Sequence, residues 1–289
     1  MTVKISPIVA GVMNWGVWDK NLNAKEMTTL IDAFLAQNIT SFDHADIYGG
    51  YTTETSFGEA LSQSGIDRKA IQLISKCGIK LISNERNYKI KHYDYSADYI
   101  IWSAENSLKN LQTDYLDLFL LHRPSPLLQP DEVAKAIEQL KLQGKILSFG
   151  VSNFTNSQTE LLQKSVKIDY NQIQFSATHF DAMLDGSLDY MQSNNIIPMA
   201  WNPLGSMFKE DSEQTRRLQK ILTGLVAKYE VSSDILLLSW VLQHPSHIIP
   251  VVGTTNSTRI QQLNNAKKIK LDLEDWFAIW TESQGNEIP

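Results

Sequence analysis

The stretch LDLFLLHRPSPLLQPDEVAKAIEQLKLQGKILSFGV, residues 116–151, contains an apolar run, a polar loop, an amphipathic segment and a second apolar run. The two apolar runs, 116–121 and 146–151, are dense rather than alternating, which is typical of strands covered on both faces. Between them, apolar residues recur at helical spacing over 131–143, and Gly144 is suited to end the helix. This order predicts one parallel β-α-β unit.

The same alternation of strand and helix continues along the chain. Candidate strands lie at 8–12, 40–43, 71–76, 116–121, 146–151, 171–175, 197–201 and 248–252. Candidate helices lie at 23–37, 54–63, 98–111, 131–143, 155–164, 186–194, 212–229, 232–243 and 257–266. Eight βα units predict an α/β fold, a (β/α)8 TIM barrel with right-handed crossovers. A doubly wound sheet competes, but no G-x-G-x-x-G motif follows a strand to support a Rossmann-type site.

Length and composition favour one domain. The chain has 289 residues without a Pro/Gly/Ser-rich linker, so we expect a single barrel domain over 1–289. The segment 77–97 is too long for an ordinary βα connection and is predicted to be an extended loop after the third strand. The segment 272–289 carries several aromatic residues and is predicted to be an ordered, helical C-terminal extension.

Charge and hydropathy argue against several functional classes. The net charge of −6 argues against a nucleic-acid partner, which usually selects a basic surface. No run approaches the roughly 18 apolar residues of a membrane span, and no signal-like apolar region is visible, so we expect a cytoplasmic protein without a membrane partner. The single cysteine, Cys77, excludes an intramolecular disulfide and is expected to be a buried, inert thiol.

Four ionisable residues lie at or just after predicted strands. Asp43 closes the second strand, Lys76 closes the third and His122 follows the fourth, whereas Tyr48 lies in the loop after the second. The carboxyl ends of barrel strands converge on one face. We therefore expect these four side chains to meet at one rim.

These four residue types suit the delivery of a proton to a carbonyl oxygen. A free tyrosine has a pKa near 10, and the Lys76 ammonium is expected to bring the pKa of Tyr48 towards neutral pH. Asp43 would pair with Lys76 and compensate its buried charge. His122 would polarise the carbonyl by hydrogen bonding. The hydride must come from a cofactor, because no side chain supplies one.

Other interpretations of these residues stay open at this point. Asp43, His44 and Asp46 could form a metal site, although no further ligands have the spacing of one. Lys76 could form a Schiff base in a lyase or aldolase, which would leave Tyr48 unexplained. Each residue taken alone could also be structural.

Six motifs in order resemble the aldo-keto reductases. They are FDHADIYG at 42–49, SKCG at 75–78, LLHRP at 120–124, GVSNF at 150–154, NQIQF at 171–175 and WNPLGS at 201–206. The correspondence runs from about residue 5 to 266, and the stretch 90–124 is most similar to bacterial oxidoreductases close to the potassium-channel β subunits. The resemblance implies a catalytic tetrad of Asp43, Tyr48, Lys76 and His122. It also implies NADPH (or NADP+) as cofactor, a small-molecule carbonyl substrate, and a monomer or weak dimer.

The resemblance further implies a nicotinamide site. The carboxamide would be held by Ser152, Asn153 and Gln172, and Trp201 would stack on the ring. Val12 and Met13 would border the nicotinamide. Asn202, Leu204 and Ser206 match the loop that lies along the pyrophosphate.

The segment PVVGTTNSTRIQQL at 250–263 is expected to hold the adenosine end, because barrels often bind phosphate after their last strands. Gly253 would allow close backbone approach, and Thr254 and Thr255 offer hydroxyl and N–H groups. Arg259 would clamp a 2′-phosphate and Gln262 would reach the adenine. Many family members carry a lysine where this chain has Val251, and Gln174 replaces a glutamate, so the NADPH preference depends mainly on Arg259.

Aromatic residues near the expected rim suggest a substrate class. Trp15, Trp18 and Tyr93 are predicted to line the pocket, which favours apolar or aromatic aldehydes and ketones over sugars. A regulatory subunit that holds NADPH as a redox sensor, with little turnover, is the alternative function. It would combine tight cofactor binding with very slow reduction of every carbonyl tested.

Overall fold

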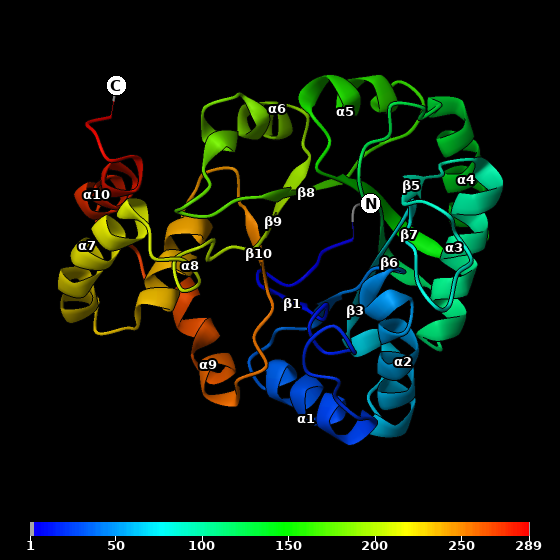
Figure 1. The fold of residues 1–289 in the computed structure, drawn as a ribbon, viewed down its shortest axis with the longest axis horizontal. Helices are drawn as coiled ribbons and strands as arrows, with labels where there is room; N and C mark the ends of the chain where they lie inside the picture. The colour runs from blue at the N-terminus through cyan, green and yellow to red at the C-terminus, as the bar shows by residue number, and fades with distance from the viewer. Residues whose placement is uncertain (1–2, 289) are drawn as a thin grey trace.

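The computed structural model describes residues 3–288, which form a closed barrel of parallel strands surrounded by helices (Figure 1). The barrel strands are β1 (Val9–Gly11), β2 (Ser41–Asp43), β3 (Gln72–Cys77), β6 (Leu116–Leu121), β7 (Ile146–Ser152), β8 (Tyr170–Gln174), β9 (Ile197–Trp201) and β10 (Ile249–Val252). Their order around the barrel is β1-β10-β9-β8-β7-β6-β3-β2, and β1 pairs with β2 to close it. The predicted (β/α)8 barrel and its eight strands are confirmed.

Ten α-helices are present in the described residues. They are α1 (Ala24–Leu35), α2 (Thr53–Ser64), α3 (Ala97–Asn110), α4 (Pro130–Leu142), α5 (Asn156–Gln163), α6 (Ser187–Ser193), α7 (Glu213–Tyr229), α8 (Ser233–Leu242), α9 (Ser257–Gln262) and α10 (Leu273–Gln284). Short 3₁₀ helices are η1 (Tyr48–Gly50), η2 (Arg68–Ala70), η3 (Asp181–Met183) and η4 (Leu263–Lys267). Between residues 3 and 288, no helix combines the length and apolar character that a membrane crossing requires.

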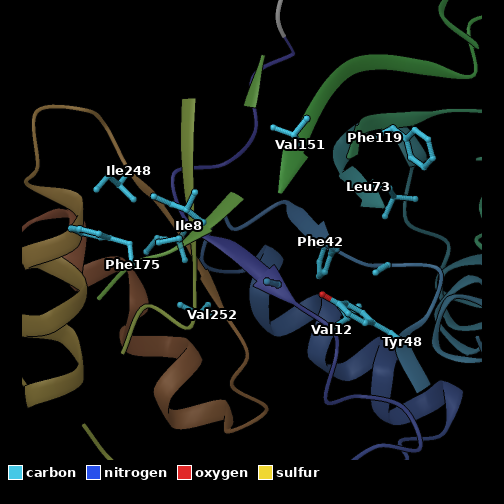
Figure 2. Close-up of a cluster of buried hydrophobic side chains, with 14 of the residues drawn as sticks. Ile8, Val12, Phe42, Tyr48, Leu73, Phe119, Val151, Phe175, Ile248 and Val252 are labelled. Atoms are coloured by element: carbon cyan, nitrogen blue, oxygen red, sulfur yellow. The ribbon is translucent and has the colours of Figure 1, made fainter. Parts of the chain in front are cut away.

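The barrel strands separate two apolar cores, because alternate strand residues face opposite sides. Most of the buried side chains pack between the strands and the helices, as Figure 2 shows for Phe42, Leu73 and Phe119. A smaller cluster fills the interior of the barrel. Its buried members are Ile5, Val9, Ile74, Leu118, Leu120, Tyr170, Met199 and Val251.

The position of the interior cluster explains where the polar site lies. Lys76 stands two residues after Ile74 on β3, so it takes the next inward-facing position towards the carboxyl end. Gln172 stands in the same relation to Tyr170 on β8. The inward-facing positions thus change from apolar to polar at the carboxyl ends of the strands.

The predicted loop at 77–97 is ordered and contains an antiparallel hairpin of β4 (Ile79–Lys80) and β5 (His92–Tyr93). Tyr51, directly after η1, anchors it: the Tyr51 hydroxyl accepts a hydrogen bond from the Leu81 N–H at 2.7 Å. The Arg86 guanidinium lies 5.0 Å from the Tyr51 ring centroid and 4.8 Å from that of Trp102 on α3. The loop is therefore fixed to two elements of the barrel shell.

The predicted C-terminal extension is also helical. On α10, Trp276 stacks on Trp240 of α8 with ring centroids 4.9 Å apart and planes 13° apart. Each indole Nε1–H donates to the backbone carbonyl of the other tryptophan, at 3.0 and 3.1 Å. This reciprocal pair explains why the aromatic-rich extension is ordered; Pro289, its last residue, lies outside the described residues.

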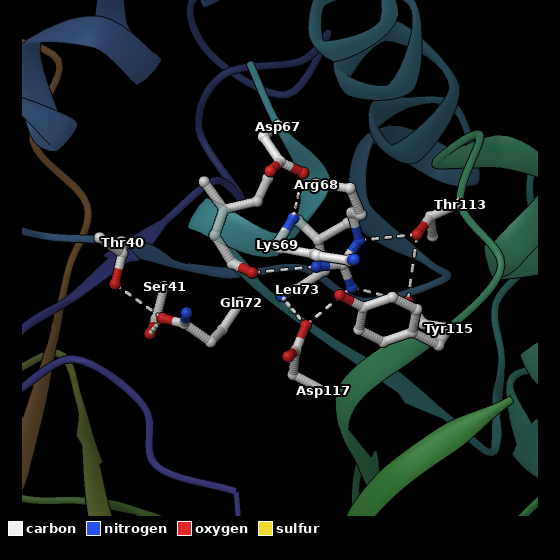
Figure 3. Close-up of polar contacts among 11 residues, drawn as sticks. Thr40, Ser41, Asp67, Arg68, Lys69, Gln72, Leu73, Thr113, Tyr115 and Asp117 are labelled. Carbon is white, nitrogen blue, oxygen red and sulfur yellow. Dashed lines mark hydrogen bonds and ion pairs between the residues drawn. The ribbon is translucent and has the colours of Figure 1, made fainter. Parts of the chain in front are cut away.

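Arg68 links strands at the amino-terminal end of the barrel (Figure 3). Its guanidinium donates to Asp117 Oδ2 and to Thr113 Oγ1, each at 2.7 Å, and lies 4.0 Å from the Tyr115 ring centroid. Asp117 Oδ2 also accepts the Leu73 N–H at 2.9 Å. The Asp117 side chain is only 8% exposed, so its carboxylate is compensated mainly by this ion pair and not by water. These contacts of Arg68 and Asp117 join the first residues of β3 and β6.

We predict that Arg68→Ala lowers the free energy of unfolding by about 3–5 kcal/mol, because it leaves a buried carboxylate without its partner. Arg68→Lys should lower the free energy of unfolding less, because the positive charge remains and only the planar set of guanidinium N–H donors is lost. The control is Arg216→Ala on α7, whose bidentate partner Asp211 is 76% exposed, and which should lower the stability far less. The free energy of unfolding is measured by urea denaturation. Equal decreases for the two alanine variants would contradict a structural role for the Arg68–Asp117 ion pair.

Candidate active site

Lys76 is the centre of the polar site at the carboxyl ends of β2 and β3. Its Nζ donates to Asp43 Oδ2 at 2.8 Å, to the His44 carbonyl at 2.7 Å and to the Tyr48 hydroxyl at 3.1 Å. An ammonium has three N–H donors, so each has one acceptor. The side chain is fully buried, and its charge is compensated entirely within the site.

The backbone between Asp43 and Tyr48 is tied to β3, which fixes the position of the phenol. The His44 N–H donates to the Ile74 carbonyl at 2.9 Å, and the Asp46 N–H donates to the Lys76 carbonyl at 3.0 Å. Tyr48 then begins η1, where Gly49 adopts φ +61°. A Cβ on Gly49 would lie 2.5 Å from the Thr53 hydroxyl. Glycine at this position therefore lets the loop close against α2.

His122 completes the group from the end of β6. Its backbone N–H donates to the Cys77 carbonyl at 2.9 Å, which extends the strand pairing by one residue. Its ring lies edge-on to Tyr48, with centroids 6.0 Å apart and planes 77° apart. The structure thus brings together the four residues Asp43, Tyr48, Lys76 and His122.

Burial sets the protonation states of this group. Burial lowers the pKa of His122 well below its usual value, and the Lys76 charge acts in the same direction. Burial raises the pKa of Tyr48, and the opposing effect of Lys76 is smaller. Burial alone would lower the pKa of Lys76, but Asp43 and Tyr48 outweigh it and raise that pKa. At neutral pH the phenol and imidazole are therefore neutral and the ammonium is charged.

The direction of the Tyr48 shift differs from the expectation that Lys76 would bring the phenol pKa towards neutral pH. The reason is that desolvation of the phenolate outweighs the attraction of the neighbouring ammonium. The consequence is chemically useful, since a protonated phenol is the form that a proton donor requires.

The residues predicted to hold a carboxamide lie beside this group. The Asn153 amide N–H donates to the Ser152 hydroxyl at 2.7 Å, and the Trp201 Nε1–H donates to Asn153 Oδ1 at 2.9 Å. The Gln172 amide donates to Asp43 Oδ1 at 3.1 Å. One hydrogen-bonded chain therefore runs from Lys76 through Asp43 to Gln172. Asn153 adopts φ +60° directly after β7, which turns its side chain between the serine and the indole.

The residues after β1 do not all lie where the sequence predicts. Trp15 is completely buried, with its ring 6.1 Å from Phe34 and 5.9 Å from Phe57. These partners lie on α1 and α2, so Trp15 belongs to the core between the barrel and the helices, and its predicted place in the pocket wall is wrong. Val12 is also completely buried and presents no surface to a cofactor in this structure, whereas Met13 is 46% exposed.

Two other predicted pocket residues are accessible. Trp18 is 46% exposed, and its ring centroid lies 6.1 Å from that of Tyr48. Tyr93 on β5 is 38% exposed. Trp18 is thus next to Tyr48, while Tyr93 lies on the hairpin that follows β3.

The residues expected along the dinucleotide are accessible at least in part. Asn202, Leu204 and Ser206 follow β9 and are half-buried, and Asn202 Oδ1 accepts from Lys209 at 3.0 Å. After β10, Thr254 and Thr255 are half-buried, and Gly253, Arg259 and Gln262 are exposed. A Cβ on Gly253 would have no atom within 4 Å. Within residues 3–288 the Arg259 guanidinium has no hydrogen bond or ion pair, so it is available to a ligand.

The three residues considered as a metal site have separate partners. Asp43 pairs with Lys76, the Asp46 carboxylate accepts from Ser103 at 3.1 Å, and the His44 ring lies edge-on to Phe57 with centroids 4.3 Å apart. Across residues 3–288, no group of three or more His, Cys, Asp or Glu side chains has the arrangement to hold a metal ion. Burial also raises the pKa of Cys77 well above its usual value, which fits the expected buried thiol.

Sequence reasoning missed two features of the site. Glu54 on α2 is buried beneath it and accepts a hydrogen bond from the Ser75 hydroxyl at 2.6 Å. A glutamate at the start of a predicted helix does not by itself indicate a buried position. Arg123 follows His122 directly, and its guanidinium lies 5.5 Å from the Trp201 ring centroid. Its place in the LLHRP motif, directly after His122, is the sequence feature that points to it.

A groove of about 780 Å³ lies elsewhere, along α4, and reaches the end of α5. Its lining includes Asp131, Lys135, Glu138 and Lys164. These residues are on the outer helices and not at the strand ends. The groove is therefore separate from the hydrogen-bonded residues around Lys76.

Comparison with known proteins gives consistent matches. The sequence model of the Aldo/keto reductase family matches residues 7–282. The chain is 42% identical to the uncharacterized oxidoreductase YcsN of Bacillus subtilis, covering 99% of this chain and 97% of the relative. It is 36% identical to a 6-dehydroglucose reductase of Agrobacterium fabrum, with the same coverage of the two chains.

Solved structures show the same fold. A thermostable aldo-keto reductase, Tm1743, crystallised with the inhibitor epalrestat, superposes with a TM-score of 0.81 over 96% of this chain and 95% of that chain. The two sequences are 24% identical, so this likeness concerns the barrel architecture.

We predict that His44 makes the protein sensitive to acid. His44 is completely buried, both ring nitrogens lack partners among the described residues, and burial followed by the Lys76 charge lowers its pKa to about 3. The pKa of His44 is lower in the folded state than in the unfolded chain. Its contribution to the free energy of unfolding is therefore fully present above pH ~6.5 and is lost as the pH falls towards the folded-state pKa. At about pH 4.5 this linkage amounts to roughly 2–3 kcal/mol.

The His44→Leu variant should therefore lose less of its melting temperature than the wild type between about pH 7 and pH 4.5. His179→Gln is the control, because the His179 side chain is 39% exposed in the loop after β8, and this variant should follow the wild type. Parallel melting profiles for wild type and His44→Leu, recorded by circular dichroism, would contradict the prediction.

Proposed function

Because the chain belongs to the aldo/keto reductase family, we propose that it is an NADPH-dependent reductase that converts aldehydes or ketones to alcohols. The observation that carries the proposal is the chain of hydrogen bonds from Asp43 through Lys76 to the Tyr48 hydroxyl, with the His122 ring beside it. Relatives named as oxidoreductases and reductases support this class of chemistry.

The roles of the four residues follow from their geometry. A carbonyl substrate is placed with its oxygen at the Tyr48 hydroxyl and next to His122. As this oxygen gains negative charge, Tyr48 transfers its proton to it, and the neutral His122 donates a hydrogen bond. Lys76 stabilises the phenolate that Tyr48 becomes, and Asp43 holds the ammonium in place. The nicotinamide cofactor, when bound, supplies the hydride to the carbonyl carbon.

The family uses nicotinamide cofactors, and the residues present fit such a group. The side-chain amides of Asn153 and Gln172 carry donors and acceptors that match a carboxamide. Their internal hydrogen bonds would be exchanged for bonds to the ligand. The open backbone at Gly253 and the unpaired guanidinium of Arg259 suit the phosphate-bearing end. We assign the preference for NADPH to Arg259.

The residues near Tyr48 favour a broad class of carbonyl substrates. Trp18 beside Tyr48 provides an apolar surface for an aromatic or aliphatic carbonyl compound. The relatives named 6-dehydroglucose reductase place polyhydroxylated aldehydes among the compounds to test. We expect the protein to act in the cytoplasm as a monomer or weak dimer, without a nucleic-acid or membrane partner.

We predict that Tyr48→Phe lowers kcat by about 10²–10⁴-fold with carbonyl substrates, because the proton donor is removed. The dissociation constant for NADPH, measured from tryptophan fluorescence, should change little. Tyr115→Phe, at the opposite end of the barrel, is the control and should keep wild-type turnover. Near-normal turnover of Tyr48→Phe would exclude the assigned role, and tight NADPH binding without turnover in the wild type would favour the redox-sensing alternative.

We predict that Arg259→Gln weakens NADPH binding by about 10- to 100-fold, the size expected for lost charge-assisted hydrogen bonds. NADH binding should be unchanged, because NADH lacks the 2′-phosphate. Arg216→Gln removes the same charge from an exposed position on α7 and should affect neither cofactor. Equal losses for NADPH and NADH in Arg259→Gln would show that this side chain does not recognise the 2′-phosphate.

A further inference from the structure

Arg123 is a cation at the site that the proposed proton transfer does not use. It follows His122, and its backbone is fixed on both sides by one side chain. The Tyr95 hydroxyl accepts the Arg123 N–H at 3.2 Å and donates to the Arg123 carbonyl. Tyr95 is itself buried. The starting point of the arginine side chain is therefore set by the protein core.

The arginine side chain reaches across the mouth of the barrel. Its guanidinium carbon lies 5.5 Å from the ring centroid of Trp201, the last residue of β9. In the barrel, β6 and β9 are separated by β7 and β8. The guanidinium of the residue that follows His122 therefore reaches towards Trp201, which is assigned to the nicotinamide. A substrate bound at Tyr48 would be next to it.

No acidic group of the described chain neutralises Arg123. Within residues 3–288 its guanidinium forms no hydrogen bond and no ion pair, although it has five N–H donors. The carboxylate in the site, Asp43, is already bonded to Lys76 and Gln172. By contrast, Arg68 pairs with Asp117 at 2.7 Å. The donors of Arg123 are thus left for a ligand.

The surrounding charge strengthens this argument. Burial is the main reason for the low pKa of His122, and the charges of Lys76, Arg123 and Lys91 all act in the same direction. Three cations therefore influence one imidazole at the mouth of the site. The charge of Lys76 is compensated by Asp43, so Arg123 is the cation at this site that is left for a substrate, although the whole chain has a net charge of −6. Local charge, and not net charge, governs which substrate enters.

We propose that Arg123 binds an anionic group, a carboxylate or a phosphate, on the substrate that Tyr48 protonates, and so selects acidic aldehydes or ketones over neutral ones. This inference rests on the proposed reductase function. A guanidinium presents parallel N–H donors that match the paired oxygens of either anion. The apolar surface of Trp18 would contact the part of the substrate between the carbonyl and the anion.

The test compares substrates that differ in charge and share one ring. The ratio of kcat/KM for 4-formylbenzoate to that for its neutral methyl ester is measured with NADPH. We expect the wild type to favour the acid, and Arg123→Gln to lower the ratio by about 10- to 100-fold, the size of a lost charge-assisted contact. Lys135→Gln on α4 removes one positive charge far from the strand ends and should leave the ratio unchanged. A parallel series with 4-formylphenyl phosphate distinguishes a phosphate site from a carboxylate site.

A binding measurement separates this proposal from the reductase assignment. Calorimetry follows 4-(hydroxymethyl)benzoate, the alcohol product, as it binds the complex of the chain with NADP+; binding by the wild type and its loss in Arg123→Gln support the anion site. If both aldehydes are reduced with a ratio that Arg123→Gln does not change, the anion site is overturned and the reductase assignment stands. If neither aldehyde is reduced, the reductase assignment fails, and the calorimetry decides on Arg123 independently. Loss of NADPH affinity in Arg123→Gln, with an unchanged ratio, would place the guanidinium against the cofactor and overturn the proposal.

Discussion

The buried ammonium of Lys76 is the constraint on which the site depends. A fully buried charge is costly unless every donor has a partner, and here the three partners come from β2, from the loop after it and from η1. These elements must therefore converge on one atom of β3. The tight turn at Gly49 and the backbone ties of His44 and Asp46 follow from that requirement. The same geometry that compensates the charge also places the Tyr48 phenol beside it.

The Arg68 ion pair and the polar site around Lys76 lie at opposite ends of the barrel strands. At the amino-terminal end, Arg68 joins β3 to β6 through Asp117, and interior side chains such as Leu118 fill the barrel above it. At the carboxyl end, the inward-facing positions become polar and carry Lys76 and Gln172. This separation is a property of β/α barrels, in which loops at one end can change without loss of the core. The rigidity needed to hold Lys76 is provided by residues at the other end of the strands and in the barrel interior.

The sequence was sufficient to predict the barrel and the grouping of Asp43, Tyr48, Lys76 and His122, because both depend on local patterns. Dense apolar runs mark the strands, and the residue at the end of a parallel strand reaches the common rim whatever the details of packing. Trp15 was mispredicted for the opposite reason. A tryptophan after β1 suits a pocket or a core equally well, and the choice is made by its packing against Phe34 on α1 and Phe57 on α2, which depends on how these helices are placed against the barrel. The Tyr48 pKa likewise depends on burial, which no local pattern specifies.

Whether a cation has an acidic partner within the protein indicates its function more clearly than its position in the sequence does. Lys76 and Arg68 have acidic partners within the protein, and both act on the chain itself, by orienting a phenol and by joining two strands. Arg123 and Arg259 have no such partner among residues 3–288, and both lie where a bound molecule would pass, one between β6 and β9 and one after β10. A guanidinium left unpaired beside buried polar groups retains its hydrogen-bonding capacity for a ligand. We therefore propose that the two unpaired guanidinium groups of this acidic chain bind anions, Arg259 on the cofactor and Arg123 on the substrate.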